Sequence, residues 1–227
     1  NIIMNSPESI GIQLRPDQNL IVQQGINEGT ITINGYRSYG MMTTTGQSSG
    51  FLNQDPAIGN GTSALGLRAT GIINVNGDES TGFAILVPIN EWGGGGTINV
   101  GMVNPNQDPV NGNLHSSVNL VERATGLYSN QPNLVVSCGS VLTGCGNAEI
   151  IGTGSINIGT FAYQSAGVRA EGTGIIGNTG NINITGNGNY GVVITDQGIF
   201  NNHVWTLSAY EGKIKVTSDN SIGAFIN

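Results

Sequence analysis

A short pattern of apolar residues recurs along the chain at a constant spacing. The pattern begins with two apolar residues that are separated by one position. A glycine follows nine positions after the first of them, and an apolar residue, a residue of any type and a second apolar residue come after the glycine. Five copies share this spacing, and they pair Ile2 with Gly11, Ile31 with Gly40, Ile73 with Gly82, Ile182 with Gly191 and Ile214 with Gly223. Alternation of apolar and polar residues indicates strands with one buried face. The repeat therefore constrains the fold more than any other feature.

Less regular copies extend the pattern. A sixth copy, from Ile156 to Gly167, has two extra residues in its corner, and one from Val118 and Leu120 to Gly126 is one residue short. Residues 96–100 resemble a first strand alone, and residues 66–69 a second strand alone. The residue two before the glycine is often serine, as at Ser9, Ser38, Ser80, Ser165 and Ser221.

The spacing of the first strands predicts a stack of similar coils. Their starts lie 29, 42, 25, 58, 26 and 32 residues apart, so the two long steps contain either an extra turn or an insertion. One unit cannot bury its own inner face, whereas units stacked about 4.8 Å apart can. A weaker third strand, as at Leu20 and Val22 or Val204 and Leu207, completes each coil. We predict an all-β, right-handed parallel β-helix of roughly seven to nine coils with loop insertions.

The composition agrees with this fold. Only 9% of the residues are charged, against roughly 25% in an ordinary soluble domain, and 37 are glycine. Asn, Gly, Thr, Ser and Ile favour strands and turns over helices. We expect Ile and Val to point inward, Gly and Asn to form the corners, and outward Thr, Asn and Ser to pair from coil to coil.

Three segments break the pattern, namely residues 44–62, 86–95 and 101–149. Insertions in solenoids often carry binding, although they can also only cap or decorate the rod. Trp92 is the best candidate for stacking on a sugar, while plugging the end of a coil is its alternative role. His115, Arg123 and Tyr128 accompany it as candidate ligand-binding residues in the largest break.

Two cysteines lie in the largest break, in the sequence SCGSVLTGCG. Cys138 and Cys145 are favoured to close a small disulfide loop, which implies an oxidising compartment. The alternative is two reduced thiols. Because no histidine is near them, the pair makes a poor metal site.

Residue chemistry excludes several functions. The net charge is −7 and the seven Lys and Arg residues are scattered, so we expect no nucleic-acid partner. No phosphate-binding loop or calcium-binding repeat is present, so we expect neither cofactor nor metal. Asp78 and Glu79 form the only adjacent acidic pair, and an enzyme needs carboxylates that converge. We therefore expect no enzyme, although acids on different coils can meet in space.

The units GTITINGYRSYGM, GNINITGNGNYGVVI and GKIKVTSDNSIGAFI resemble the passenger domains of large type V autotransporter adhesins, above all those of the fusobacterial kind. The resemblance implies that residues 1–227 are one β-helical segment of a longer passenger. It also implies a virulence-associated, extracellular location at the bacterial surface, with the outer-membrane anchor outside this segment. This segment itself would not insert into the membrane.

The resemblance implies that the passenger binds a host-cell receptor protein, a glycan or a partner bacterium. It supplies no motif that marks a binding residue. Two alternatives stay open, namely a stalk segment without its own ligand and a β-helical polysaccharide lyase or hydrolase.

Overall fold

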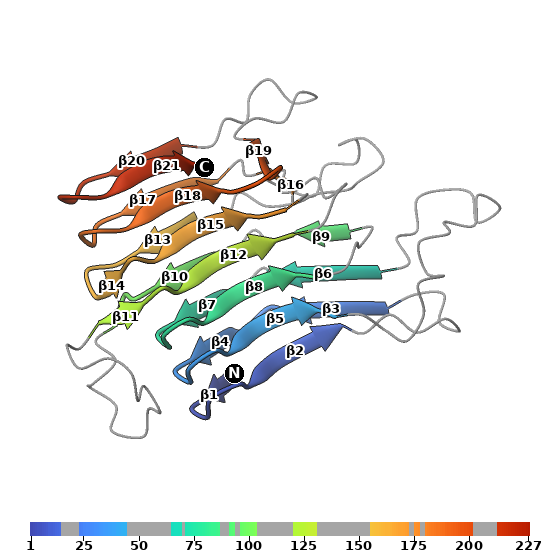
Figure 1. Ribbon diagram of the computed structural model, residues 1–227. Coiled ribbons are helices and arrows are strands. Elements are labelled where there is room, and N and C mark those ends of the chain that lie inside the picture. Colours follow the sequence, from blue (N-terminus) through green and yellow to red (C-terminus); the bar gives the residue numbers. More distant parts are fainter. Residues whose placement is uncertain are drawn as a thin grey trace.

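The computed structural model describes residues 1–14, 23–44, 65–69, 71–86, 91–93, 96–103, 120–130, 155–172, 175–177, 180–201 and 213–227. Every regular element among them is a β-strand, and every strand pair is parallel. The strands stack coil upon coil from the N-terminus to the C-terminus (Figure 1). The predicted all-β parallel β-helix is confirmed.

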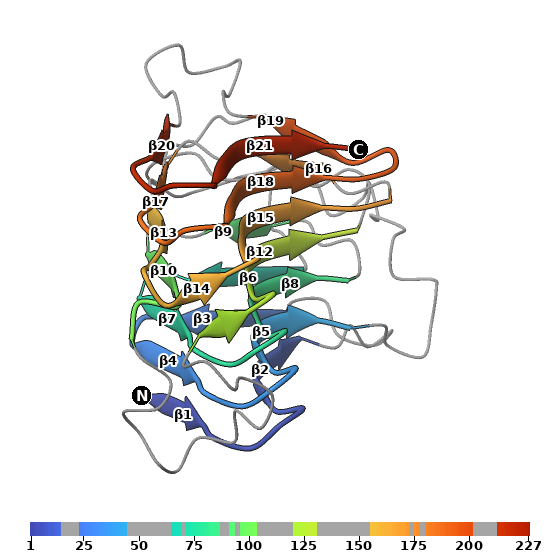
Figure 2. The same cartoon turned by 60° about the vertical axis from the view of Figure 1, so that its left-hand side comes forward.

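Two seven-stranded sheets form most of the rod (Figure 2). Sheet A consists of β1 (Ile2–Met4), β4 (Thr30–Ile33), β7 (Ile72–Val75), β10 (Thr97–Val100), β13 (Ser155–Ile158), β17 (Asn181–Ile184) and β20 (Lys213–Val216). Sheet B consists of β2 (Ile10–Leu14), β5 (Tyr39–Thr43), β8 (Thr81–Ile85), β12 (Thr125–Ser129), β15 (Ala166–Ala170), β18 (Tyr190–Ile194) and β21 (Ile222–Ile226). Each coil gives one strand to each sheet.

Shorter strands occupy the remaining faces. Sheet C consists of β3 (Gln23–Asn27), β6 (Leu65–Ala69) and β9 (Glu91–Gly93), and β16 (Ile175–Gly177) pairs with β19 (Ile199–Asn201). At the corner between sheets A and B, β11 (Val121–Glu122) pairs with β14 (Ala162–Tyr163). The third strand expected at Leu20 and Val22, or at Val204 and Leu207, lies outside the described residues.

The strand register explains the two long steps of the repeat. Ile31 is the direct partner of Ile73, and Ile98 is the direct partner of Ile156. Strands that pair directly belong to successive coils, so no extra turn lies between them. Each long step is therefore a single coil lengthened by insertions.

Residues 96–100 form a first strand as predicted, but two other irregular copies, at Leu120 and at Gly66, differ from the prediction. Residues 96–100 and Gly126 belong to one coil, because β10 supplies its strand in sheet A and β12 its strand in sheet B. Leu120 is not part of a first strand, since it immediately precedes β11, and Val118 lies outside the described residues. Gly66 lies on β6 of sheet C and not on a strand of sheet B.

The range 101–149 therefore includes part of the rod. Within it, residues 120–130 hold β11 and β12, and β12 pairs with both β8 and β15. Residues 104–119 and 131–149, where the insertion was expected, lie outside the described residues.

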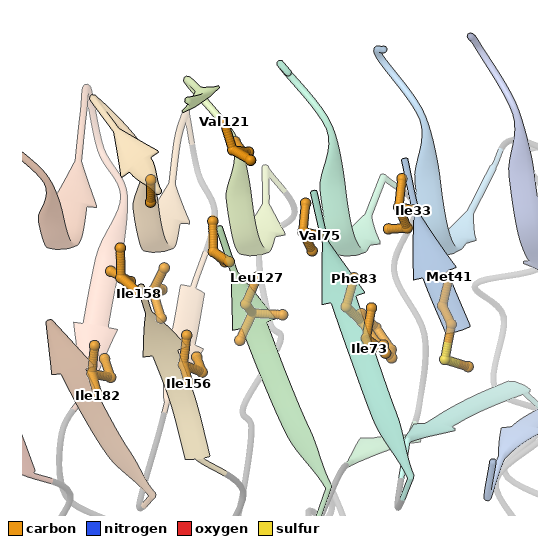
Figure 3. Packing of buried hydrophobic residues seen from close by; sticks show 14 of the residues in the cluster. Ile33, Met41, Ile73, Val75, Phe83, Val121, Leu127, Ile156, Ile158 and Ile182 are labelled. Carbon is orange, nitrogen blue, oxygen red and sulfur yellow. The ribbon is translucent and has the colours of Figure 1, made fainter. Parts of the chain in front are cut away.

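The core is a set of apolar columns along the axis. Ile31, Ile73, Ile182 and Phe83 are fully buried, and inward side chains of sheets A and B stack on their equivalents in neighbouring coils (Figure 3). At the inner positions of the repeat Ile and Val point inward as expected, whereas Ile10, Val193 and Ile222 lie outside the core cluster. Full burial of one inward side chain stabilises the fold by about 1.5–3 kcal/mol.

The repeated glycine allows sheet B to approach the next coil closely. A Cβ atom at Gly82 would lie only 2.7 Å from the carbonyl oxygen of Gly126, and one at Gly126 would lie 2.6 Å from that of Gly167. Real Cβ atoms essentially never come this close to a backbone oxygen. Steric exclusion of any side chain thus explains why the repeat keeps glycine here.

The recurrent serine joins neighbouring coils at the corner before sheet B. The Ser80 hydroxyl accepts the backbone N–H of Ser38 at 2.9 Å and donates to the carbonyl of Gly35 at 2.7 Å. Ser165 makes the equivalent bonds, with Ala124 as donor and Val121 as acceptor, both at 3.1 Å. These buried hydroxyls satisfy backbone groups that leave the strand ladder at the corner.

Candidate functional site

The outer face of sheet A carries a column of asparagines that bond to one another. The side-chain amide of Asn99 donates to Asn74 at 2.9 Å, that of Asn157 to Asn99 at 3.0 Å, and that of Asn183 to Asn157 at 2.9 Å. This confirms the expected pairing of outward polar side chains from coil to coil. Much of the hydrogen-bonding capacity of this face is therefore used within the rod.

The outer face of sheet B has a different composition. Alternation is interrupted at the repeated glycine, because a Cβ atom at Gly40 would point at the core residues Ile33 and Ile73 while the next residue, Met41, also lies in the core. The positions on either side of this inward pair therefore turn outward. One column, two residues after the repeated glycine, is Gln13, Met42, Ala84, Tyr128, Arg169, Val193 and Phe225. The other, one residue before the glycine, is Ile10, Tyr39, Thr81, Thr125, Ala166, Tyr190 and Ile222. Aromatic residues thus occur on this face at four coils.

Several aliphatic residues of this outer face are buried. Met42 is 5% exposed, Ala84 is 0% exposed and Val193 is 5% exposed, yet none of them belongs to the core cluster inside the rod. Tyr128 is the direct strand partner of Ala84, and Arg169 is the direct partner of Tyr128. Tyr39, Tyr128, Arg169 and Glu171 in this region are all partly exposed.

Tyr128, Arg169 and Glu171 form a connected group, which we call the Tyr128 site. The Tyr128 hydroxyl donates to Glu171 Oε2 at 3.1 Å, and Arg169 Nη1 donates to Glu171 Oε1 at 3.1 Å. The side chains of Arg169 and Glu171 are 29% and 33% exposed. The site therefore presents a ring, a guanidinium and a carboxylate together at the surface.

The surroundings keep the Tyr128 hydroxyl protonated. Partial burial, followed by the negative charge of Glu171, raises the pKa of Tyr128 to about 12. Tyr39, two coils away, lies close enough to add to this increase. At neutral pH the phenol is accordingly a hydrogen-bond donor held in a fixed direction by Glu171.

A second aromatic contact lies towards the C-terminal end of the same face. Tyr190 on β18 and Phe225 on β21 meet edge to face, with ring centroids 5.9 Å apart and an angle of 64° between the rings. This geometry is one that aromatic pairs favour. Phe225 remains 39% exposed, so the aromatic character of the face extends over several coils.

The corner between sheets A and B holds a column of residues with left-handed backbone. Seven residues, each three positions before the repeated glycine, have φ between 50° and 71°. They are Glu8, Arg37, Glu79, Arg123, Gln164, Gly188 and Asn220. Gly or Asn was expected at corners that need such a conformation, and five of the seven positions depart from this expectation.

Alternating charge explains part of this departure. Glu79 forms ion pairs with Arg37 at 2.8 Å and Arg123 at 2.9 Å, and it accepts a hydrogen bond from the Tyr36 hydroxyl at 3.2 Å. The hydrogen bond from Arg37 lowers the pKa of Glu79, and the same contact raises the pKa of Arg37. These contacts between coils oppose the cost of the left-handed backbone.

The predicted ligand-binding residues occupy different places in the rod. Tyr128 lies on the outer face of sheet B, whereas Arg123 lies in the corner column with its side chain 58% exposed and paired to Glu79. The backbone of Trp92 lies on β9, opposite Leu67, but its side chain is not described. His115, Cys138 and Cys145 lie outside the described residues.

Residues that the sequence did not single out complete the candidate site. Tyr39, Arg169 and Glu171 join Tyr128, and all but Glu171 occupy outward positions of the repeat. Comparing the outward residue across copies would have found Arg169 next to Tyr128. Glu171 lies just beyond β15, so the repeat gives no signal for it.

The adjacent acids Asp78 and Glu79 make structural contacts. Asp78 is 2% exposed and its Oδ1 accepts the backbone N–H of Glu122 at 2.9 Å, while Glu79 is held by two arginines. Within the described parts of the chain, no three His, Cys, Asp or Glu residues lie together as a metal site would need. No helix in those parts is long and apolar enough to cross a membrane.

Comparisons with family models, with curated proteins and with solved structures give no significant match.

Proposed function

We propose that this rod is a segment of a bacterial surface adhesin, an autotransporter passenger whose coils display a binding face. The observation that carries the proposal is the contrast between the two outer faces. Sheet A bonds its polar side chains to one another, whereas sheet B turns tyrosines and an arginine–glutamate pair outward. Exposed aromatic and charged groups on a rigid scaffold are typical of recognition surfaces.

The partner in this proposal is a host-cell receptor protein, a host glycan or another bacterium. The likeness of the repeat units to adhesin passengers supports this choice and an extracellular location. A repetitive rod suits that location, because each coil needs only its neighbours to fold and can extend the chain away from the cell.

The second candidate is a stalk segment without a ligand of its own. The asparagine column, the serine contacts and the paired corner charges favour it, because all of them join one coil to the next. The Tyr128–Glu171 hydrogen bond also joins two coils, but a stalk has no requirement for a partly exposed ring beside a charged pair. The two functions are therefore separated by substituting that site.

Adhesion of beads that carry the 227-residue chain to epithelial cells and to bacteria tests the proposal. The variant combines Tyr39→Ala, Tyr128→Ala and Arg169→Ala, all on sheet B. The matched control combines Ile72→Ala, Asn181→Ala and Lys213→Ala, all exposed residues of β7, β17 and β20 in sheet A. We expect saturable adhesion that the variant loses and the control keeps.

A complete lack of adhesion by the unsubstituted chain would contradict the adhesin and favour the stalk. Equal adhesion of variant and control would show that the binding surface is not the outer face of sheet B. Deletions that address the expected insertion should remove residues 104–119 or 131–149 separately, because a deletion of 101–149 also removes β11 and β12.

A further inference from the structure

We propose that the Tyr128 site binds a neutral saccharide, with Tyr128, Arg169 and Glu171 as its contact residues. This inference rests on the proposed adhesin function and gives that function a ligand class and a place on the rod. It follows from the chemistry that the site presents, from its exposure and from its charge.

The groups of the site match the two kinds of surface on a sugar. A sugar ring has an apolar face of C–H groups, which packs on an aromatic face, and a rim of hydroxyls, which donate and accept hydrogen bonds. Tyr128 supplies the aromatic ring and Tyr39 a second one nearby. Glu171 accepts from sugar hydroxyls, and Arg169 donates to them.

The hydrogen bonds within the site leave capacity for a ligand. Each carboxylate oxygen of Glu171 accepts one bond, from Tyr128 or from Arg169. A carboxylate has about four lone-pair sites and a guanidinium has five N–H donors. The internal bonds thus hold the groups in position before binding, which reduces the ordering cost when the ligand arrives.

The exposure around the Tyr128 site favours a small polar ligand over a protein. The outward aliphatic residues Met42 and Ala84 are 5% and 0% exposed, so they offer little apolar area to a partner. Stable protein interfaces bury about 800 Å² on each side around an apolar core. The accessible groups here are rings and hydrogen-bonding atoms, as a saccharide requires.

The charge of the site selects the class of saccharide. Arg169 and Glu171 are paired at 3.1 Å, so their charges cancel locally, and the chain as a whole carries a net charge of −7. A sialylated or sulfated sugar gains no net attraction from such a surface. Neutral oligosaccharides are therefore the expected ligands.

An array of neutral, sialylated and sulfated oligosaccharides, probed with the labelled 227-residue chain, tests the inference. We expect binding to neutral members, followed by calorimetric titration with the strongest of them. Tyr128→Ala and, separately, Glu171→Gln should each weaken that binding about tenfold or more, since the first removes the ring and the second replaces a charged acceptor oxygen by an NH₂ donor. Tyr163→Ala is the matched control, because Tyr163 is a tyrosine 40% exposed at the corner and outside the site.

Circular dichroism and thermal unfolding show whether each variant keeps the fold. If Tyr128→Ala does not fold, the partly exposed Glu171→Gln carries the test. The inference is overturned if no neutral oligosaccharide binds, if only charged ones bind, or if both site variants bind as tightly as the unsubstituted chain.

A second experiment separates this inference from the adhesin function. Bead adhesion is measured on cells before and after enzymatic removal of their surface glycans. Loss of adhesion after removal supports the inference. Adhesion that persists overturns the saccharide ligand and leaves the adhesin standing, whereas absence of adhesion on untreated cells contradicts the adhesin itself.

Discussion

The outer faces of sheets A and B differ although their inner faces are built alike. Both sheets fill the core with stacked aliphatic side chains from the same repeat. Outside, sheet A repeats an amide that bonds to the next amide, whereas sheet B places glutamine, methionine, alanine, tyrosine, arginine, valine and phenylalanine at the equivalent outward position of successive coils. A ladder constrains the residue at each coil that it spans, here those of β7, β10, β13 and β17, and a face without a ladder is free to acquire contacts with a ligand.

The same contrast places structure and recognition on different surfaces of one coil. In the coil of β13 and β15, Asn157 faces outward from sheet A and Arg169 faces outward from sheet B. Asn157 bonds to the coils on both sides, while Arg169 bonds to Glu171 within its own coil. Substitutions in this coil can therefore separate stability from binding.

The largest expected effect concerns the backbone of sheet B. Gly82→Ala places a Cβ atom 2.7 Å from the carbonyl oxygen of Gly126, so the coils must move apart. We expect a loss of about 3 kcal/mol in the free energy of unfolding, at the upper end for overpacked sites. Chemical denaturation followed by circular dichroism measures it.

Gly223→Ala is the control for this prediction. Its Cβ atom would meet only the side chains of Ile214 and Val216 at 3.7 and 3.8 Å, which is ordinary contact. The free energy of unfolding should change by less than about 0.5 kcal/mol. Equal destabilisation by the two substitutions would show that close approach of the coils is not the reason for the repeated glycine.

The next prediction compares the stability lost by a substitution in the asparagine ladder of sheet A with that lost by a substitution on the outer face of sheet B. Asn157→Ala removes its hydrogen bonds to Asn99 and Asn183, so we expect a loss of about 2 kcal/mol in the free energy of unfolding. Arg169→Ala in the same coil removes one partly exposed ion pair, for which less than about 1 kcal/mol is expected. Urea denaturation compares the two, and a larger loss from Arg169→Ala would reverse the roles assigned to the two faces.

The fold could be predicted because its signal repeats. Ile73, Ile98, Ile156 and Ile182 occupy equivalent positions, and one inner position read from one copy holds for the others. Stacking then follows from the need to bury those faces. The sequence could not show that β10 and β12 belong to the same coil, because the residues inserted between them break the constant spacing of the repeat.

The candidate site was only partly predictable, for a physical reason. Tyr128 is a candidate from the sequence as a residue of the largest break, whereas it lies on β12 and its partners come from the next coil, 41 and 43 residues further along the chain. Proximity across coils depends on the register, which insertions obscure. The left-handed corner column was missed for another reason, since Glu and Arg are unusual choices for that backbone and their pairing appears only when coils are aligned.

A smaller effect is expected at the corner that joins the two sheets. Glu79 has a lowered pKa because Arg37 donates to it and Arg123 lies beside it. A carboxyl group with a lowered pKa contributes stability above its ordinary value, and that contribution is lost as the pH falls through the lowered value. Glu79→Gln should therefore reduce the melting temperature at neutral pH, and this difference should disappear in acid.

Thermal unfolding of the unsubstituted chain and of the Glu79→Gln variant across a pH series measures how the difference in melting temperature depends on pH. Glu122→Gln, at the neighbouring corner residue on β11, is the matched control and should not reproduce it. A difference between the Glu79 variant and the unsubstituted chain that stays constant into acid would show that the ion pairs do not stabilise the corner.

The smallest effect concerns the hydroxyl of Tyr128, which donates a hydrogen bond to Glu171 on the side of sheet B. Because the pKa of Tyr128 is raised to about 12 from an ordinary value of 10.0, the folded state holds this proton more tightly than the unfolded state. Its contribution to stability is complete below pH 10 and is lost as the pH rises through about 12.

Tyr128→Phe should cost at most about 1 kcal/mol in the free energy of unfolding at neutral pH, since one hydrogen bond is removed. It should also remove the part of the tyrosinate absorbance change near pH 12 that Tyr128 supplies. If the change near pH 12 persists undiminished in Tyr128→Phe, the hydroxyl is not held by Glu171, and the ring is then the only group through which Tyr128 distinguishes this face.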